Sequence, residues 1–314
     1  MIHLLFHSEI DRRDWWKTEF ARHLPDLAIL SLDDLETGRV PLEAVDYALL
    51  WKPPHGLTAR LPRLKGIFSL GAGVDHLLAD PDLRCDVPVT RVVDPNLTSR
   101  MTEYVVLHVL RHHRRQTDYE SLQRLEKWRV LAQPLAAERP VGILGLGVLG
   151  GAAAAALSAL GFPVAGWTRT PRDVPGVENF HGAAGLVPFL ARTEILVCLL
   201  PLTPETEGIV DSRLLAGLPR GASFINAARG GHVVEPDLLA ALDAGALSAA
   251  TLDVFRVEPL PPGNPFWTHP KVTVTPHVAA TTDPRACVAQ VAANIARIEA
   301  GERPLHRVDL DRGY

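Results

Sequence analysis

Short apolar runs, separated by polar and helix-favouring stretches, recur along the N-terminal third of the chain. They have the length of buried strands and cover residues 2–6, 27–30, 47–51 and 67–70. After the first run, Trp15, Trp16, Phe20 and Leu24 are spaced as on one face of a helix, which predicts an amphipathic helix within residues 11–24. Alternating strands and helices are typical of a parallel sheet covered on both faces.

The middle of the chain has a different pattern. Residues 98–130 contain no Pro or Gly and carry apolar side chains at Val105, Val106, Val109 and Leu110, which predicts one long helix between two domains. Strand-like runs then return at residues 141–144, 164–167, 195–199, 224–226, 249–253 and 272–275, before a last helix at 283–300. These runs predict a second open parallel sheet.

Length and composition narrow the class of protein. A chain of 314 residues corresponds to about two domains. With 47% hydrophobic and 22% charged residues, it is expected to fold. A formal net charge of -4 argues against binding to nucleic acid. We expect a cytoplasmic protein without membrane partners, since the three cysteines form no CxxC pair, charged residues follow the start closely, and no apolar run has membrane-spanning length.

A glycine motif follows the run at 141–144. Gly145, Gly147 and Gly150 fit the pattern G-x-G-x-x-G, and a helix-favouring stretch at 148–160 comes directly after them. A dinucleotide pyrophosphate needs backbone N-H groups and a helix N-terminus at such a place. The motif therefore predicts a dinucleotide site, and a tight turn without a ligand is the alternative.

The next strand ends without the carboxylate that binds the ribose 2′-hydroxyl of NAD. That position holds Trp167, Thr168, Arg169 and Thr170, and Arg172 follows closely. Because a guanidinium can bind a phosphate with two hydrogen bonds, we predict NADP(H), preferred over NAD(H). The alternative is that Arg169 and Arg172 are solvated loop charges.

Three ionisable residues follow later predicted strands. Arg229, Glu258 and His277 come after the runs at 224–226, 249–253 and 272–275. Because ligands bind at the carboxyl ends of the strands of such a sheet, we expect the three side chains to converge on one site.

These residues, behind the glycine motif, resemble the signature of the D-isomer-specific 2-hydroxyacid dehydrogenases. The likeness spans nearly the whole chain. Within the family it is nearest to the bacterial glyoxylate/hydroxypyruvate reductase type, through the strings WKPP at 51–54, LGAGVDH at 70–76, GWTRT at 166–170, EPLPP at 258–262 and RGY at 312–314.

The resemblance implies two doubly wound α/β domains with an interdomain cleft. Residues 1–98 and 279–314 would form a flavodoxin-like substrate domain. Residues 99–278 would form an inserted Rossmann domain that binds NADP. The family usually dimerises through the cofactor domain, so we expect a homodimer.

Physical chemistry suggests a task for each member of the triplet. The fixed fork of donors on Arg229 suits a carboxylate and a neighbouring keto oxygen. His277 suits the proton donor, because imidazole gains and releases a proton near neutrality. Glu258 suits the carboxylate that orients the imidazole and favours its charged form.

For the substrate, we expect the backbone N-H groups at Ala72 and Gly73 to bind the carboxylate as part of a glycine-rich anion nest. The resemblance implies that Trp51 lines the pocket and limits substrate length. It also implies that Asp253 contacts the nicotinamide carboxamide; a cap of its own loop is the alternative. The expected cofactor-binding residues are Gly145, Gly147, Val148, Leu149, Gly150, Trp167, Thr168, Arg169, Thr170, Arg172, Leu200, Pro201, Thr206, Ala227, Ala228, Arg229, Asp253, His277 and Ala279.

A second histidine group is expected to have no catalytic role. His108 and His112 have the i, i+4 spacing of a metal site, but no HExxH glutamate accompanies them, and the resembled family uses no metal. We therefore predict no metal, and a polar surface or interface formed by His108, Arg111, His112, His113, Arg114 and Arg115.

Together these patterns predict NADPH-dependent reduction of a small 2-keto acid, glyoxylate or hydroxypyruvate, to the 2-hydroxy acid. One alternative is a dehydrogenase for another D-2-hydroxy acid, such as a 2-ketogluconate-type substrate. The other is a nicotinamide-sensing regulatory protein, in which binding matters more than turnover.

Overall fold

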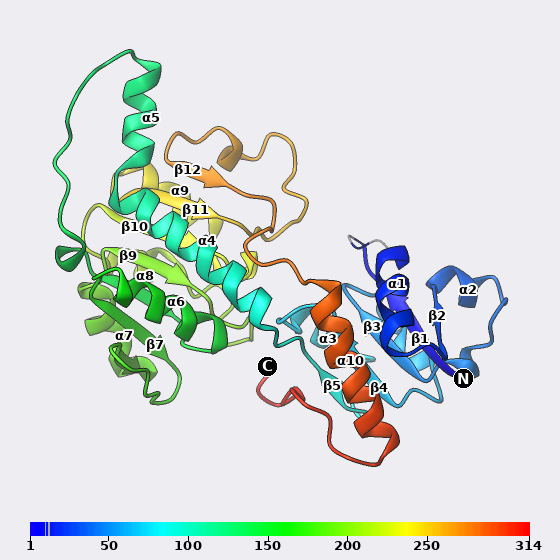
Figure 1. Ribbon diagram of the computed structural model, residues 1–314. Helices are drawn as coiled ribbons and strands as arrows, with labels where there is room; N and C mark the ends of the chain where they lie inside the picture. The colour runs from blue at the N-terminus through cyan, green and yellow to red at the C-terminus, as the bar shows by residue number, and fades with distance from the viewer. Residues whose placement is uncertain (10, 12) are drawn as a thin grey trace. The chain divides into compact units, whose positions relative to one another are not determined.

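The computed structural model describes residues 1–9, 11 and 13–314. The described chain divides into two compact units, and each is considered by itself. Unit 1 contains Met1–Leu97 and Thr281–Tyr314, and unit 2 contains Thr98–Ala280. Figure 1 shows that the two ends of the chain, drawn in blue and red, both belong to unit 1.

Unit 1 is built on a five-stranded parallel sheet in the order β2-β1-β3-β4-β5. This is the order of flavodoxin-like sheets. Its strands are β1 (Ile2–His7), β2 (Leu27–Leu30), β3 (Tyr47–Leu50), β4 (Gly66–Ser69) and β5 (Val89–Thr90). Every residue of β3 and β4 is buried, as expected for central strands covered on both faces.

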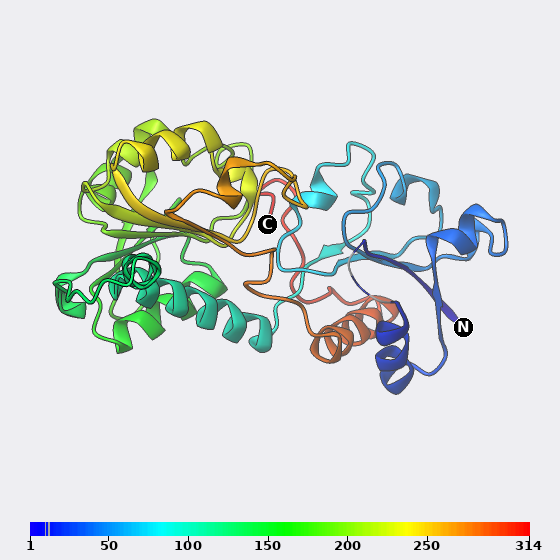
Figure 2. The ribbon, with the colours of Figure 1, turned by 90° about the horizontal axis from the view of Figure 1, so that it is seen from above.

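Helices cover both faces of this sheet. On one face α1 packs against α10 (Figure 2). The ring centroids of Trp16 in α1 and Phe6 in β1 lie 5.6 Å apart. On the other face, Leu35 of α2 and Leu77 of α3 join the strand core. The α-helices are α1 (Arg13–His23), α2 (Leu32–Glu36), α3 (Asp75–Leu78) and α10 (Pro284–Glu299), and the 3-10 helices are η1 (Leu42–Ala44) and η2 (Thr58–Arg60).

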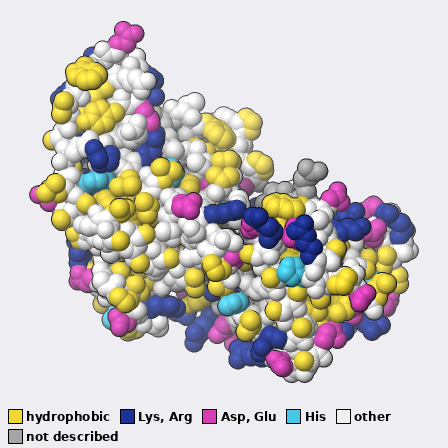
Figure 3. Space-filling view, viewed as in Figure 1, with side chains coloured by type: hydrophobic (Ala, Val, Ile, Leu, Met, Phe, Trp, Pro, Cys, Tyr) yellow, Lys and Arg dark blue, Asp and Glu magenta, His cyan; other side chains and the backbone are white. Residues whose placement is uncertain are grey.

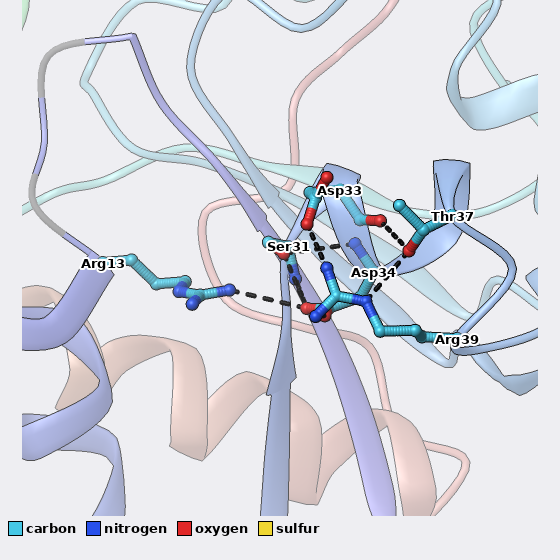
Figure 4. Close-up of polar contacts among 6 residues, drawn as sticks. All are labelled: Arg13, Ser31, Asp33, Asp34, Thr37 and Arg39. Atoms are coloured by element: carbon cyan, nitrogen blue, oxygen red, sulfur yellow. Dashed lines mark hydrogen bonds and ion pairs between the residues drawn. The ribbon is translucent and has the colours of Figure 1, made fainter.

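The start of α2 shows how local sequence determines an element. Ser31 and Asp34 form a capping box, in which Asp34 N-H donates to Ser31 Oγ and Ser31 N-H donates to the Asp34 carboxylate over 2.8 Å. Arg39 pairs with Asp33, and Arg13 Nη1 lies 3.5 Å from Asp34 Oδ2 (Figure 4). The bonds from Ser31, followed by the arginine charges, lower the pKa of Asp34 below its ordinary value.

Unit 2 contains a seven-stranded parallel sheet in the order β12-β11-β10-β9-β6-β7-β8. Counted from β6, this is the Rossmann order 3-2-1-4-5-6, extended by one strand. The strands are β6 (Val141–Leu144), β7 (Val164–Thr168), β8 (Glu178–His181), β9 (Ile195–Cys198), β10 (Ala222–Asn226), β11 (Leu247–Leu252) and β12 (Val272–Val274). The order reverses between β6 and β9, which is where such sheets bind ligands.

Helices lie on both faces of the sheet of unit 2 (Figure 2), and each face is covered by an apolar cluster. Helices α7, α8 and α9 supply one layer, and α4 and α6 supply the other. The α-helices are α4 (Pro95–His113), α5 (Gln116–Arg124), α6 (Val148–Ala159), α7 (Gly182–Ala191), α8 (Ser212–Ala216) and α9 (Glu235–Asp243), and the 3-10 helices are η3 (Ala136–Glu138), η4 (Gly230–His232) and η5 (Pro265–Trp267). The boundary between the units falls in the first turn of α4.

Both predicted parallel sheets are confirmed, but the long helix expected at 98–130 is wrong in extent. The backbone breaks after α4, where Arg115 has a φ of 55°, and α5 then starts in a new direction (Figure 1). The bidentate pair of Arg111 and Glu120, at 2.8 and 2.7 Å, stabilises this corner and lowers the pKa of Glu120. The apolar run at 141–144 and the helix that follows it lie where the sequence predicted them.

The histidines of α4 are buried within unit 2, contrary to the predicted polar surface or interface. His108, His112 and His113 are each less than 8% exposed. His112 Nε2 lies 3.0 Å from Thr251 Oγ1 inside unit 2. Burial, followed by neighbouring positive charges, lowers the pKa of His108 to about 4 and that of His112 to about 3. These imidazoles are therefore neutral core groups at physiological pH.

None of the helices in the described part of the chain combines the length and the hydropathy that a membrane span needs.

Candidate active site

The glycine motif forms a tight turn between β6 and α6. Gly145 has a φ of 98°, and a Cβ there would lie 2.8 Å from the Leu199 carbonyl oxygen. A Cβ on Gly150 would lie 1.9 Å from the Gly145 oxygen, so this position tolerates no side chain. Gly147 precedes the first turn of α6, and a Cβ on it would meet no atom within 4 Å. The turn thus combines two obligatory glycines with open backbone at a helix N-terminus, which fits a pyrophosphate.

The strand after this turn ends without an acidic residue. Arg169, Thr170 and Arg172 follow β7 and are exposed. The indole of Trp167 is engaged within the unit, because its Nε1 donates to Gly182 O over 2.9 Å. The donors that follow this strand are therefore two guanidinium groups and a hydroxyl group, which suit a 2′-phosphate better than a ribose diol.

Arg229 follows β10 on a backbone that its neighbours hold in place. Asn226, fully buried at the end of β10, donates from Nδ2 to Arg229 O over 2.9 Å and accepts from Ala228 N over 3.1 Å. A Cβ on Gly230 would lie 1.8 Å from the Phe255 carbonyl carbon, so the Arg229 loop packs directly on the loop that leads to Glu258. The sequence reasoning missed Asn226, although a polar residue ending an apolar strand was a usable signal.

Glu258 and His277 form a hydrogen-bonded pair. His277 Nδ1 lies 2.9 Å from Glu258 Oε2, and both side chains are partly buried. The other carboxylate oxygen, Oε1, accepts from Phe255 N over 3.0 Å, which fixes the orientation of Glu258. Nδ1 therefore faces the glutamate, and Nε2 is the ring nitrogen on the opposite side of the imidazole.

Asp253 anchors the turn that carries His277. His277 has a φ of 55°, a conformation that residues other than glycine rarely adopt. Asp253 O accepts from His277 N over 2.8 Å, and the Asp253 carboxylate accepts from Val278 N and Ala279 N, each over 2.9 Å. This geometry favours the loop-cap interpretation of Asp253 that the sequence left open.

A hydroxyl chain extends this anchor to α4. Thr275 Oγ1 donates to Asp253 Oδ1 over 2.6 Å and lies 2.7 Å from Tyr104 Oη. Because the single hydroxyl proton of Thr275 points to Asp253, Tyr104 donates to Thr275. Burial raises the pKa of Tyr104, so the phenol keeps this proton. Neither Tyr104 nor Thr275 was identified from the sequence.

The remaining expected cofactor positions of unit 2 also follow strand ends. Leu200, Ala227, Ala228 and Ala279 are buried, whereas Val148 is half exposed at the start of α6, where Leu149 follows it. Pro201 and Thr206 belong to one turn, since Thr206 Oγ1 donates to Pro201 O over 2.7 Å.

The expected substrate residues of unit 1 follow two neighbouring strands: Trp51 comes after β3, and Ala72 and Gly73 come after β4. Ser69 Oγ donates to Gly73 O over 3.0 Å and accepts from Gly71 N over 3.2 Å, so it holds the turn that contains Ala72. A Cβ on Gly71 would lie 2.7 Å from the Trp51 ring, which places the indole against this turn. Ser69 is a further positioning residue that the sequence reasoning missed.

No group of three or more His, Cys, Asp or Glu side chains arranged to bind a metal occurs within the described ranges.

The chain is similar to known proteins along its whole length. The model of the D-isomer specific 2-hydroxyacid dehydrogenase NAD-binding domain matches residues 106–279. A glyoxylate/hydroxypyruvate reductase A of Serratia proteamaculans is 43% identical over 318 aligned residues that cover 100% of both chains.

Two solved structures are similar over almost the full length. A D-isomer specific 2-hydroxyacid dehydrogenase of Xanthobacter autotrophicus, in complex with NADPH and MES, is 49% identical, with a TM-score of 0.93 over 99% of each chain. An NADPH-dependent glyoxylate/hydroxypyruvate reductase of Sinorhizobium meliloti, in complex with NADP and sulfate, is 45% identical, with a TM-score of 0.93 over 100% of each chain.

The Rossmann sheet, its glycine turn and the paired Glu258 and His277 define a dinucleotide-dependent oxidoreductase. The chain belongs to the D-isomer specific 2-hydroxyacid dehydrogenase family, which confirms the resemblance inferred from the sequence.

Proposed function

We propose that this protein uses NADPH to reduce a small 2-keto acid, glyoxylate or hydroxypyruvate, to the corresponding 2-hydroxy acid. The observation that carries the proposal is the His277–Glu258 pair, at 2.9 Å, on the loops that follow the sheet of unit 2. The proposal is supported by relatives that are named glyoxylate/hydroxypyruvate reductases at 43 and 45% identity over the whole chain.

His277 acts as the proton donor in this proposal. When bound, NADPH supplies the hydride that is transferred to the keto carbon of the substrate. His277 donates a proton from Nε2 to the carbonyl oxygen as negative charge develops there. Glu258 accepts from Nδ1 over 2.9 Å, which holds the ring in place for the transfer.

Arg229 and the glycine turn of unit 1 take the substrate-binding roles. The Arg229 fork binds a carboxylate oxygen and polarises the keto oxygen, which a lysine would orient less well. We assign further carboxylate binding to the N-H groups of Ala72 and Gly73, whose turn Ser69 stabilises. Trp51, packed on the same turn, limits the length of the substrate.

The choice of NADPH rests on the end of β7. We assign Arg169, Thr170 and Arg172 to the 2′-phosphate, because the loop offers two guanidiniums and a hydroxyl. The two similar solved structures contain NADPH or NADP. The N-terminus of α6 and the turn around Gly147 would bind the pyrophosphate.

We further propose a homodimer that forms through unit 2. Apolar side chains gather over the region of α5 (Figure 3). The large apolar residues that are exposed in the segment after α5 are Leu125, Trp128, Val130 and Leu135, and Trp128 is fully exposed. A cluster of this kind is typical of a surface that is covered by another chain. The cytoplasmic location expected from the sequence stays a prediction.

The test is a steady-state assay of purified protein that follows the loss of reduced-nicotinamide absorbance. NADPH and NADH are each paired with glyoxylate, hydroxypyruvate, pyruvate and 2-ketogluconate. Turnover that is fastest with NADPH and the two smaller activated keto acids supports the proposal. Turnover on 2-ketogluconate alone would favour the larger-substrate alternative, and NADPH binding without turnover on any of the four would favour a sensor.

A further inference from the structure

Asn179 lies in the middle of β8, next to the loop that follows β7. It is partly buried, and the neighbouring Phe180 packs into the core of unit 2 on the other face of the strand. Asn179 Oδ1 accepts from Arg172 N over 2.8 Å, and Nδ2 donates to Thr168 Oγ1 over 2.9 Å. One amide thus contacts both the start and the end of the segment from 168 to 172.

Two further contacts determine the direction of these bonds. The Arg172 N-H needs an acceptor, so the oxygen of the Asn179 amide must face it. Thr168 Oγ1 in turn donates to Thr170 O over 2.8 Å. The bonds therefore run from Asn179 Nδ2 to Thr168 and from Thr168 to the Thr170 carbonyl. Asn179 Nδ2 also lies 3.3 Å from Gly166 O, within β7.

The segment between β7 and β8 has no regular structure of its own from 169 to 173. Its exposed side chains are long and flexible, so ordering them on a phosphate has an entropic cost. A backbone already fixed at Thr170 and Arg172 lowers that cost, because the donors start near their bound positions.

We propose that Asn179 is a specificity-determining positioning residue for the 2′-phosphate of NADPH. This inference rests on the proposed function, because it assigns the cofactor preference to the order of the loop as well as to its charge. Asn179 acts through Thr168 and Arg172 and need not touch the cofactor itself.

The proposal predicts that aspartate, the closest analogue of asparagine in shape, cannot replace Asn179. An aspartate at this position would keep an acceptor for Arg172 N but would lose the donor to Thr168 Oγ1. The Thr168 hydroxyl would then turn toward the new carboxylate and release the Thr170 carbonyl. The added negative charge would also oppose a phosphate bound at this loop.

The experiment uses the full-length protein with Asn179→Ala and Asn179→Asp. Asn264→Ala is the matched control, since Asn264 also fixes a loop of unit 2, accepting from Phe266 N over 3.0 Å. Fluorescence titration measures dissociation constants for NADPH and NADH. Calorimetry with adenosine 2′,5′-bisphosphate and with ADP repeats the comparison without a nicotinamide ring or turnover.

We expect Asn179→Ala to weaken binding of NADPH and of the 2′,5′-bisphosphate about tenfold, in line with the loss of more than one hydrogen bond. Binding of NADH and ADP should change by less than about twofold, since neither carries the 2′-phosphate. Asn179→Asp should lose still more NADPH affinity, and Asn264→Ala should leave the NADPH-to-NADH ratio unchanged.

Two results would overturn the proposal, and they are distinguishable. If the wild-type protein prefers NADPH and Asn179→Ala weakens both cofactors equally, Asn179 is only structural and the proposed function is unaffected. If the wild-type protein binds NADPH and NADH equally, the cofactor assignment of the proposed function fails and the role of Asn179 fails with it.

Discussion

His277 occupies a left-handed backbone conformation that only its surroundings can maintain. Such a conformation costs free energy, of order 1 kcal/mol or more, and persists only where interactions with neighbouring groups offset that cost. Asp253 supplies these groups, since it binds the backbone N-H of His277 and of the two residues that follow. Proton donation in the proposed reaction therefore depends on a buried carboxylate as well as on the imidazole.

The first prediction concerns the hydroxyl chain behind this carboxylate. Thr275→Val keeps the shape of the side chain but removes the bonds to Asp253 and Tyr104, so His277 should be held less well. We expect kcat to fall about tenfold with an unchanged Kd for NADPH, because only the positioning of the proton donor is lost. Stopped-flow measurement of the reduction step checks this.

Tyr104→Phe removes only the outer member of the chain and should give a smaller loss. The double variant should be no worse than Thr275→Val, because the phenol acts through the threonine. Full additivity of the two effects on kcat would show that the residues act independently.

The second prediction concerns His277 itself. His277→Gln should lower kcat about a thousandfold, since general acid catalysis contributes at that scale. Its Kd for NADPH should stay within about twofold, because the proton is given to the keto acid. Glu258→Gln should lower kcat by a smaller factor, as the ring keeps a hydrogen-bond partner. Near-normal turnover in His277→Gln would remove it from the acid role.

These residues also show what sequence alone can locate. Arg229, Glu258 and His277 were proposed because each follows a recognisable apolar strand. The structure pairs Glu258 with His277, whereas a site shared with Arg229 stays a prediction. Asn226, Thr275 and Tyr104 were not proposed, because they act through hydrogen bonds, and Tyr104 lies 171 positions from its partner. Nothing in local composition distinguishes such a tyrosine from any other on an amphipathic helix.

At the scale of elements, too, the sequence predicts what local composition determines and misses what depends on distant contacts. The central strands were predicted because burial on both faces makes them continuously apolar. The edge strand β8 was missed, since its sequence, ENFH, contributes one core side chain and is otherwise polar. The break between α4 and α5 was missed as well, because Arg115 adopts positive φ without a glycine or proline to signal it.

The third prediction follows from the buried histidines of α4. The unfolded chain takes up a proton at each histidine near pH 6.5, whereas in the folded state His108 waits until about pH 4 and His112 until about pH 3. Between pH 6.5 and these lower values, the unfolded state binds more protons than the folded state. The free energy of unfolding is therefore highest above pH 6.5 and decreases as the pH falls.

Urea unfolding at several pH values between 7.5 and 4.5 measures this slope. The slope measured for His112→Leu should be smaller than that of the wild type by about one proton. An identical slope in His112→Leu and wild type would contradict the neutral buried state assigned to His112.

At the scale of the whole molecule, the two units differ in how the chain builds them and in the binding roles proposed for them. Unit 2 is continuous in sequence and carries the glycine turn, the loop proposed to bind the 2′-phosphate and the proposed proton donor, whereas unit 1 is assembled from both chain ends. Hydrophobic patterning predicted both sheets, but it could not show which surfaces stay uncovered. Exposure depends on packing between distant segments, and the apolar residues after α5 look in sequence like a core segment.

The fourth prediction tests whether a second copy covers that surface. Trp128 is fully exposed and Leu125 is 61% exposed, so replacing both by glutamate places charge on the proposed interface while leaving the core of unit 2 intact. Light scattering after size exclusion should give twice the chain mass for the wild type and a single chain mass for the variant. Trp15→Glu, on the half-exposed tryptophan of unit 1, is the matched control and should remain dimeric. A wild-type protein that elutes as one chain at every concentration would leave the apolar surface without this partner, whereas a dimer that survives both glutamates would place the interface elsewhere on the molecule.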